Sequence, residues 1–131
     1  MEVSLVLDTS AYSNFIIDKH ELQRFINARN PIFVPVIVLG ELKSGFLNGN
    51  KNKENNDFIT EFLDSSNVTI LEINERTAQK YAEINLQLKK AGKPIGTNDM
   101  WIAAICIENN LPLLTLDADF SNIPNLECLE I

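Results

Sequence analysis

The stretch Val3-Ser4-Leu5-Val6-Leu7-Asp8-Thr9-Ser10, residues 3–10, decides how the rest of the chain is interpreted. Residues 3–7 form a short, mostly apolar run without clear alternation, which is typical of a strand covered on both faces inside a parallel sheet. The run stops at Asp8, and two small hydroxyl residues follow it. In open α/β sheets, ligands bind beyond the carboxyl ends of the strands. We therefore expect a reacting group or metal ligand at Asp8, if other segments bring partners to it.

Length and composition describe an ordinary globular domain. The chain has 131 residues, of which 45% are hydrophobic, and a domain of this size buries roughly two thirds of its unfolded surface. We expect a single domain over residues 1–131. No apolar run approaches the ~20 residues of a membrane span, and Glu2 interrupts what would be the basic region of a secretory signal. These features predict a cytoplasmic protein.

Charge and thiol content limit the classes of function. The net charge of −7 argues against nonspecific nucleic-acid binding, which depends on Lys and Arg contacts to phosphates; the distribution of charge matters more than its sum, so that objection stays open. Cys106 and Cys128 belong to no CxxC motif or Cys/His cluster, and we expect reduced packing residues. His20, the sole histidine, stands in Asp-Lys-His-Glu, a setting that does not suggest a catalytic triad.

Short apolar segments alternate with helical patterns along the chain, which predicts an α/β fold around a mostly parallel sheet. The polar run at residues 48–56 is the best loop candidate, and residues 117–121 are a turn or short helix. We expect strands at residues 3–7, 32–34, 68–71, 113–116 and 126–131, and helices at residues 11–18, 20–28, 36–47, 57–64, 75–91 and 98–109.

Glycines and apolar spacing add detail to the predicted helices. Gly92 is a plausible C-cap for the helix at residues 75–91. Gly40 and Gly45 lie inside a helix, where each costs about 1 kcal/mol against alanine, so a close-packing reason is expected for them. The predicted packed face of the helix at residues 75–91 consists of Ala78, Tyr81, Ala82, Asn85 and Leu88.

Glu41 and Asp99 each share a helix face with apolar or small residues. A carboxylate turned toward a packed face is costly unless it is paired or coordinates a cation. For Glu41 the structural alternative is an ion pair with Lys43 or Lys51. For Asp99 it is the common first-turn aspartate that favours the helix dipole. Either residue alone leaves the choice between structure and function open.

Asp117 and Asp119 follow the strand predicted at residues 113–116, just as Asp8 follows the first strand. Turn and N-cap chemistry is the alternative for each. Parallel strands place their carboxyl ends on one edge, so two strand ends and two helix faces would bring carboxylates together. Without Arg or Lys, such a cluster raises its own pKa values unless a hard divalent cation neutralises it.

Mg²⁺ or Mn²⁺ suits an all-oxygen site of this kind. Two such ions about 3.5–4 Å apart can activate a water and stabilise the leaving oxygen in phosphodiester hydrolysis. Thr9, Ser10 and Thr115 are hydroxyl residues that could hold coordinated waters or orient the carboxylates, although local backbone hydrogen bonds are the commoner use of such side chains.

Four segments together resemble the signatures of PIN-domain ribonucleases, and most closely the VapC-type toxins of bacterial toxin–antitoxin pairs. They occur in the family's order and spacing across nearly the whole chain. The segments are Leu-Asp-Thr-Ser at 7–10, Val-Leu-Gly-Glu-Leu-Lys-Ser-Gly at 38–45, Pro-Ile-Gly-Thr-Asn-Asp-Met-Trp-Ile-Ala-Ala at 94–104 and Leu-Leu-Thr-Leu-Asp-Ala-Asp-Phe at 113–120.

The resemblance implies a three-layer α/β/α sandwich and an endoribonuclease that depends on Mg²⁺ or Mn²⁺. It also implies a homodimer and a small antitoxin partner whose tail enters the acidic groove. As catalytic and metal-binding residues it indicates Asp8, Glu41, Asp99 and Asp117, with Asp119 as a possible auxiliary ligand and Thr9 and Thr115 as supporting hydroxyls.

The expected substrate is RNA, with tRNA or rRNA as the favoured class, selected by shape or loop sequence. Four lysines near the signature segments are candidate phosphate contacts, or else lie on solvated helix faces: Lys43, Lys89, Lys90 and Lys93. Either Asp99 or Asp117 could orient the attacking water.

Three other classes of function were weighed against this one. A noncatalytic RNA-binding or partner-binding PIN domain is the main alternative. A haloacid-dehalogenase-like phosphatase would need an aspartate where Ser10 stands, and a receiver domain would need an acidic pair near the N-terminus. No glycine-rich nucleotide motif is present.

The role of Asp8 can be tested by its effect on stability. If Asp8 belongs to a repulsive cluster, Asp8→Asn without metal should leave the stability of the protein unchanged or raise it. A large loss of stability would instead mark Asp8 as a structural hydrogen-bond partner.

Overall fold

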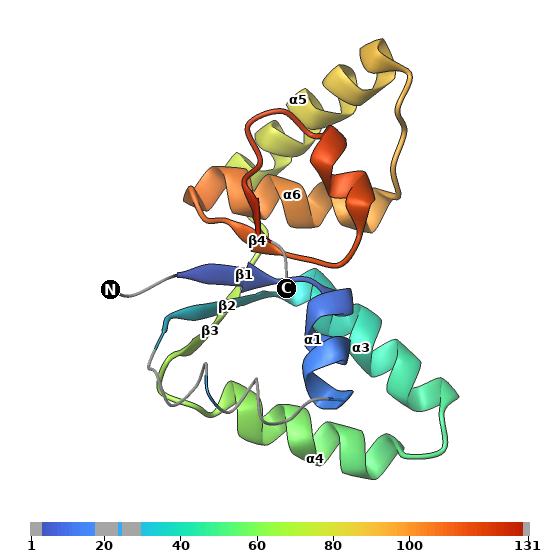
Figure 1. The fold of residues 1–131 in the computed structure, drawn as a ribbon, viewed down its shortest axis with the longest axis vertical. Helices are drawn as coiled ribbons and strands as arrows, with labels where there is room; N and C mark the ends of the chain where they lie inside the picture. Colours follow the sequence, from blue (N-terminus) through green and yellow to red (C-terminus); the bar gives the residue numbers. More distant parts are fainter. Residues whose placement is uncertain (1–3, 18–23, 25–29, 130–131) are drawn as a thin grey trace.

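The structure is a computed structural model that describes residues 4–17, 24 and 30–129. Within these residues, parallel strands form one sheet in the order β3-β2-β1-β4-β5. Helices cover both faces of the sheet, with α1, α3 and α4 on one side and α5 and α6 on the other (Figure 1). The predicted three-layer α/β/α sandwich is therefore confirmed.

The elements agree closely with the segments expected from the sequence. A 3₁₀ helix, η1 (Ala118–Asn122), lies between the last two strands. The strands are β1 (Leu5–Leu7), β2 (Ile32–Pro35), β3 (Val68–Leu71), β4 (Leu113–Leu114) and β5 (Cys128–Leu129). The helices are α1 (Thr9–Ile17), α3 (Val36–Asn48), α4 (Asn52–Leu63), α5 (Glu75–Ala91) and α6 (Thr97–Asn109). The helix expected at residues 20–28, with His20, lies outside the described residues, as does the end of the last predicted strand.

Strand β1 lies at the centre of the sheet and is buried on both faces, with Leu5, Val6 and Leu7 no more than 2% exposed. This burial explains why its sequence is continuously apolar instead of alternating. On one side Leu5 pairs with Ile32, and on the other Val6 pairs with Leu113. The order of strands along the sheet reverses at β1. The carboxyl ends of β1 and β4 consequently flank the crevice in which doubly wound folds bind ligands.

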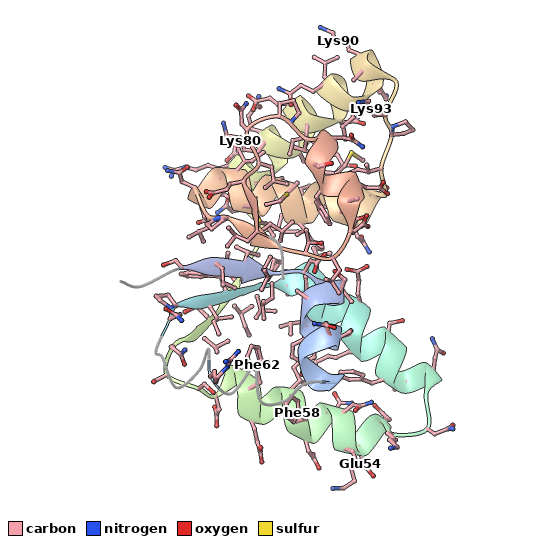
Figure 2. The ribbon with its side chains drawn as sticks, in the orientation of Figure 1. Glu54, Phe58, Phe62, Lys80, Lys90 and Lys93 are labelled. Atoms are coloured by element: carbon pink, nitrogen blue, oxygen red, sulfur yellow. The ribbon has the colours of Figure 1, made fainter. Side chains whose placement is uncertain are left out.

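The loop predicted at residues 48–56 is correct in its place but too long, because only residues 49–51 separate α3 from α4, which already begins at Asn52. Side chains in this polar run support the first helical turns: the amide of Asn56 donates to the backbone oxygen of Asn52 at 2.9 Å, and Lys53 pairs with Asp57 at 3.1 Å. Farther along, Phe58 and Phe62 lie on the side of α4 that faces α1 (Figure 2). From residue 52 onward, the polar composition therefore belongs to a solvated helix and not to a loop.

Two packing expectations also need correction. A Cβ atom added at Gly40 or Gly45 would meet nothing within 4 Å, so the close approach expected at these glycines is absent. The packed face of α5 is rotated from the predicted one, since Thr77, Ile84 and Leu88 are its buried residues and Ala78 and Ala82 are exposed. Residues 115–116, predicted to extend β4, leave the strand. Gly92, in contrast, is the predicted C-cap, with a φ of 67°.

Both cysteines are free, Cys106 in the core and Cys128 half-buried in β5, as expected for packing residues. Among the helices that the structure describes, none has both the length and the apolarity that a bilayer crossing requires.

Candidate active site

A cavity of about 250 Å³ opens at the carboxyl ends of β1 and β4, beside the first turn of α6. Its lining is rich in carboxylates and hydroxyls, and among the described residues no lysine or arginine contributes to it. Helices α1 and α3 begin at this edge of the sheet (Figure 1). We call it the acid cavity; its lining residues are Asp8, Thr9, Ser10, Ser13, Glu41, Asp99, Ile102 and Asp117.

Asp8 is the most deeply placed of these acids, at 4% exposed. Its Oδ1 accepts hydrogen bonds from the Ser10 hydroxyl and the Ala11 backbone N–H, both at 2.8 Å. Its Oδ2 accepts a hydrogen bond from the Thr115 hydroxyl. The bond from Ala11 satisfies a free N–H group in the first turn of α1, which is the role of an N-cap residue. Asp8 is therefore a structural hydrogen-bond partner as well as a lining residue of the cavity.

Two hydroxyls tie the end of β4 to Asp8. Thr115 donates to Asp8 and accepts from the Asp117 backbone N–H at 3.0 Å. Ser10 donates to Asp8 and accepts from the Leu116 backbone N–H at 3.0 Å. The supporting position predicted for Thr115 agrees with these contacts. Ser10 was named from the sequence only as one of several candidate hydroxyls, although its position two residues after Asp8 was the available signal.

Glu41, on α3, is hydrogen-bonded to a hydroxyl group of α1. The Thr9 side chain donates a hydrogen bond to Oε1 of Glu41 at 2.8 Å, which links the first residue of α1 to the middle of α3. The alternative of an ion pair is not found among the described residues, and Lys43 instead donates to the Asn56 side chain at 3.1 Å. Glu41 is half-exposed at the wall of the acid cavity, so one oxygen stays available to a ligand.

Asp99 is half-buried in the first turn of α6, and its pKa is raised from 3.8 to about 6. Burial is the largest cause, followed by the negative charges of Asp117, Glu41, Asp8 and Asp119. The helix-dipole position that was weighed for Asp99 is real, yet it does not offset these effects. The acids predicted from four separate segments thus share one electrostatic environment.

Asp117 and Asp119 differ in their placement. Asp117 lines the acid cavity and also caps η1, because one of its oxygens accepts from the Asp119 backbone N–H at 2.9 Å. Asp119 is exposed and does not line the cavity. The structure therefore brings Asp8, Glu41, Asp99 and Asp117 together and leaves Asp119 outside.

A family model described as PIN domain matches residues 5–126 of the chain. The match includes every strand from β1 to β4 and every residue that lines the acid cavity. The chain belongs to the PIN-domain family. The resemblance noted from the four sequence segments is therefore confirmed.

Relatives of this PIN domain carry the name ribonuclease. Ribonuclease VapC2 of Rickettsia felis is 31% identical over 118 residues, which cover 86% of this chain and 87% of the relative. Ribonuclease VapC of Rickettsia bellii is 34% identical over 128 residues, covering 95% and 84%. Among solved structures, VapBC2 from Rickettsia felis bound to a promoter DNA fragment matches with a TM-score of 0.82 and 29% identity over 98% of each chain. The predicted likeness to VapC-type proteins agrees with these matches.

The donor set of this PIN domain suits a hard divalent cation. The acid cavity offers carboxylate and hydroxyl oxygens, which Mg²⁺ and Mn²⁺ prefer. The pKa of Asp99 is raised first by burial and then by four neighbouring negative charges, and a cation would offset the second cause. Across residues 4–17, 24 and 30–129, no three acidic, histidine or cysteine side chains already stand in a metal-binding arrangement.

Proposed function

We propose that this PIN domain is an endoribonuclease that depends on Mg²⁺ or Mn²⁺ and serves as the toxin of a toxin–antitoxin pair. The observation that carries the proposal is the meeting of Asp8, Glu41, Asp99 and Asp117 in one cavity at the carboxyl ends of β1 and β4. These residues come from four separate segments, and most have no packing reason to converge. The names of the relatives support ribonuclease chemistry for such a cavity.

In the proposed mechanism, the four carboxylates would hold the metal, and the hydroxyls orient the carboxylates. When bound, Mg²⁺ or Mn²⁺ would supply charge neutralisation and activation of water for attack on the phosphodiester. Asp8 is held in place by its three hydrogen bonds. Thr9 fixes one oxygen of Glu41. Either Asp99 or Asp117 would orient the attacking water.

The proposed substrate is RNA, with tRNA or rRNA as the favoured class. Lys43, Lys89, Lys90 and Lys93 are all exposed, and Figure 2 shows Lys90 and Lys93 together at the C-terminal end of α5. Residues 84–98 carry Lys89, Lys90 and Lys93 and no acid. This segment runs directly into the first turn of α6, which holds Asp99. It is therefore the proposed basic surface for phosphates of an RNA whose cleaved bond lies in the acid cavity.

An antitoxin protein is the proposed partner, and a homodimer the proposed assembly. The Rickettsia felis relative of known structure is VapBC2 on promoter DNA, which supports a partner for this chain. A cytoplasmic location belongs to the same proposal, because the RNA targets are there.

The decisive experiment is cleavage of purified tRNA and rRNA fragments in Mg²⁺, Mn²⁺ or EDTA. We expect cleavage with either metal and none in EDTA. Glu41→Gln and Asp99→Asn should lower the rate at least about 100-fold, since each removes a proposed metal ligand. Asp57→Asn is the matched control, because it removes one negative charge from an exposed residue of α4.

Two results would contradict the mechanism or the function. Cleavage that persists in EDTA would exclude the metal-dependent mechanism. A protein with intact acids that cleaves no cellular RNA pool would instead be a noncatalytic RNA-binding or partner-binding PIN domain.

A further inference from the structure

A second cavity, of about 350 Å³, adjoins the acid cavity at the carboxyl ends of β4 and β5. Asp117 lines both cavities. Thr115 lines the second cavity and donates a hydrogen bond to Asp8 in the first. A chain molecule held in the acid cavity would therefore place its next unit here. We call this second cavity the side pocket.

The walls of the side pocket are mostly apolar, with Leu116, Ala118 and Leu129 among them. Its polar groups are hydrogen-bond acceptors more than donors: Asp117 is a carboxylate, and the Ser121 hydroxyl already donates to the Ala118 backbone oxygen at 2.6 Å. In the part of the chain that the structure describes, no lysine or arginine lines it. A phosphate is poorly matched to such a pocket, whereas a flat heteroaromatic ring that carries N–H groups is well matched.

Leu116 is the more exposed of the two leucines that line the pocket. It is 54% exposed, directly after the buried Thr115. Its backbone N–H donates to Ser10, and Ser10 in turn donates to Asp8. A large apolar side chain is thus held at a fixed place relative to the acid cavity, with much of its surface open. Apolar surfaces of this kind pack against the faces of nucleobases.

We propose that the side pocket binds the nucleobase adjacent to the cleaved phosphodiester, and that Leu116 is a specificity-determining residue which forms its apolar wall. This inference rests on the proposed ribonuclease function and adds a binding site for the base. Asp117 lies between the two cavities, so the same carboxylate faces both the phosphate and the base. The Cys128 thiol, whose pKa is raised first by burial and then by the charge of Asp8, is a neutral lining group.

A binding experiment tests the side pocket without any cleavage. Amide NMR spectra of the protein in EDTA are recorded during titration with AMP, GMP, CMP, UMP and, as the probe without a base, ribose 5-phosphate. We expect shifts at Leu116, Ala118 and Leu129 with at least one nucleotide and none with ribose 5-phosphate. Leu116→Ala should weaken nucleotide binding about 5-fold or more.

Leu86→Ala is the matched control, because Leu86 is also 54% exposed but lies on α5 and lines neither cavity. It should bind nucleotides as the wild type does. Because both leucines are exposed, both variants should fold, which thermal unfolding checks.

Sequencing of the products from a randomised RNA pool tests the specificity. Leu116→Ala should change the base preference at one position next to the cleaved bond, whereas Leu86→Ala should keep the wild-type preference. If the wild type cleaves and Leu116→Ala keeps its preference, the inference is overturned while the proposed function stands. If the wild type cleaves nothing, the proposed function fails. The NMR titration tests the inference independently of cleavage: the absence of shifts at Leu116 with every nucleotide would overturn it. A Leu116→Ala variant that binds nucleotides normally but loses a protein partner would make this surface a protein interface and would also overturn it.

Discussion

At the scale of single residues, Asp8 and Glu41 line the same cavity but differ in burial and in the number of hydrogen bonds that they accept. Asp8 is buried and accepts three hydrogen bonds, one of which caps α1. Glu41 is half-exposed and accepts one, from Thr9. Loss of the Asp8 carboxylate would leave several buried donors unpaired, whereas water can replace the single partner of Glu41.

We therefore expect Asp8→Ala to lower the free energy of unfolding by about 2–4 kcal/mol and Asp8→Asn by about 1 kcal/mol. Glu41→Gln should stay within about 0.5 kcal/mol of the wild type. Urea denaturation in EDTA measures all three. This expectation differs from the neutral or stabilising effect that mutual repulsion alone predicts for Asp8→Asn. An Asp8→Asn protein more stable than the wild type would show that repulsion outweighs the hydrogen bonds.

Asp99 makes the stability of the protein depend on pH in a defined window. Its pKa is about 6 in the folded protein against the ordinary value of 3.8, so between these values the folded state holds more protons than the unfolded state. The free energy of unfolding should therefore fall as the pH rises through this window. Asp99→Asn lacks this effect. The variant should match the wild type below pH 4 and exceed it by about 1 kcal/mol at pH 7.5, once solvent screening is allowed for.

Urea denaturation of both proteins in EDTA from pH 4 to pH 8 gives the difference curve. Asp57→Asn, on exposed α4, supplies the control for the loss of one charge. A difference between Asp99→Asn and the wild type that is independent of pH would contradict the raised pKa.

At the scale of helices, two glycines are expected to have opposite effects when replaced by alanine. Gly45 lies inside α3 with open space around an added Cβ, so Gly45→Ala should raise the free energy of unfolding by about 0.5–1 kcal/mol. Gly92 ends α5 with a φ of 67°, where a side chain is strained, so Gly92→Ala should lower it by about 1 kcal/mol. Thermal or urea unfolding distinguishes the two. A destabilising Gly45→Ala would indicate that a partner surface approaches this helix.

The sequence predicted those elements whose signal is local. Strand β1 and the single acid that follows it, Asp8, are predicted from burial and from the geometry of a parallel sheet, and α5 is predicted from its length and its Gly92 cap. The start of α4 was missed because side-chain bonds such as Asn56 to Asn52 stabilise a helix whose composition resembles a loop. The bridge from Ser10 to Leu116 depends on a contact 106 residues away, and no local pattern reports it.

At the scale of the whole molecule, the sheet order explains why the acids meet. Strand β1 has neighbours on both sides, so its carboxyl end lies next to that of β4 at the point where the order reverses. Helix α3 brings Glu41 from one face of the sheet, and α6 brings Asp99 from the other (Figure 1). Carboxylates from both helical layers therefore line the same cavity and repel one another. A bound cation would link both layers, and its binding energy would add to the stability of the whole fold.

This linkage predicts that Mg²⁺ or Mn²⁺ stabilises the protein. At a metal concentration ten times the dissociation constant, the gain is about 1.4 kcal/mol, which corresponds to a rise in Tm of roughly 4–7 °C for a domain of this size. Thermal unfolding is measured with metal and with NaCl at equal ionic strength, which separates binding from screening. Glu41→Gln and Asp99→Asn should show a much smaller rise, since each replaces a charged carboxylate of the acid cavity by a neutral amide, a weaker ligand for a hard cation. Asp57→Asn removes the same charge from exposed α4 and should retain the full rise. Equal rises in all four proteins would mean that the cation acts on the general negative charge of the surface, and would exclude the acid cavity as its site.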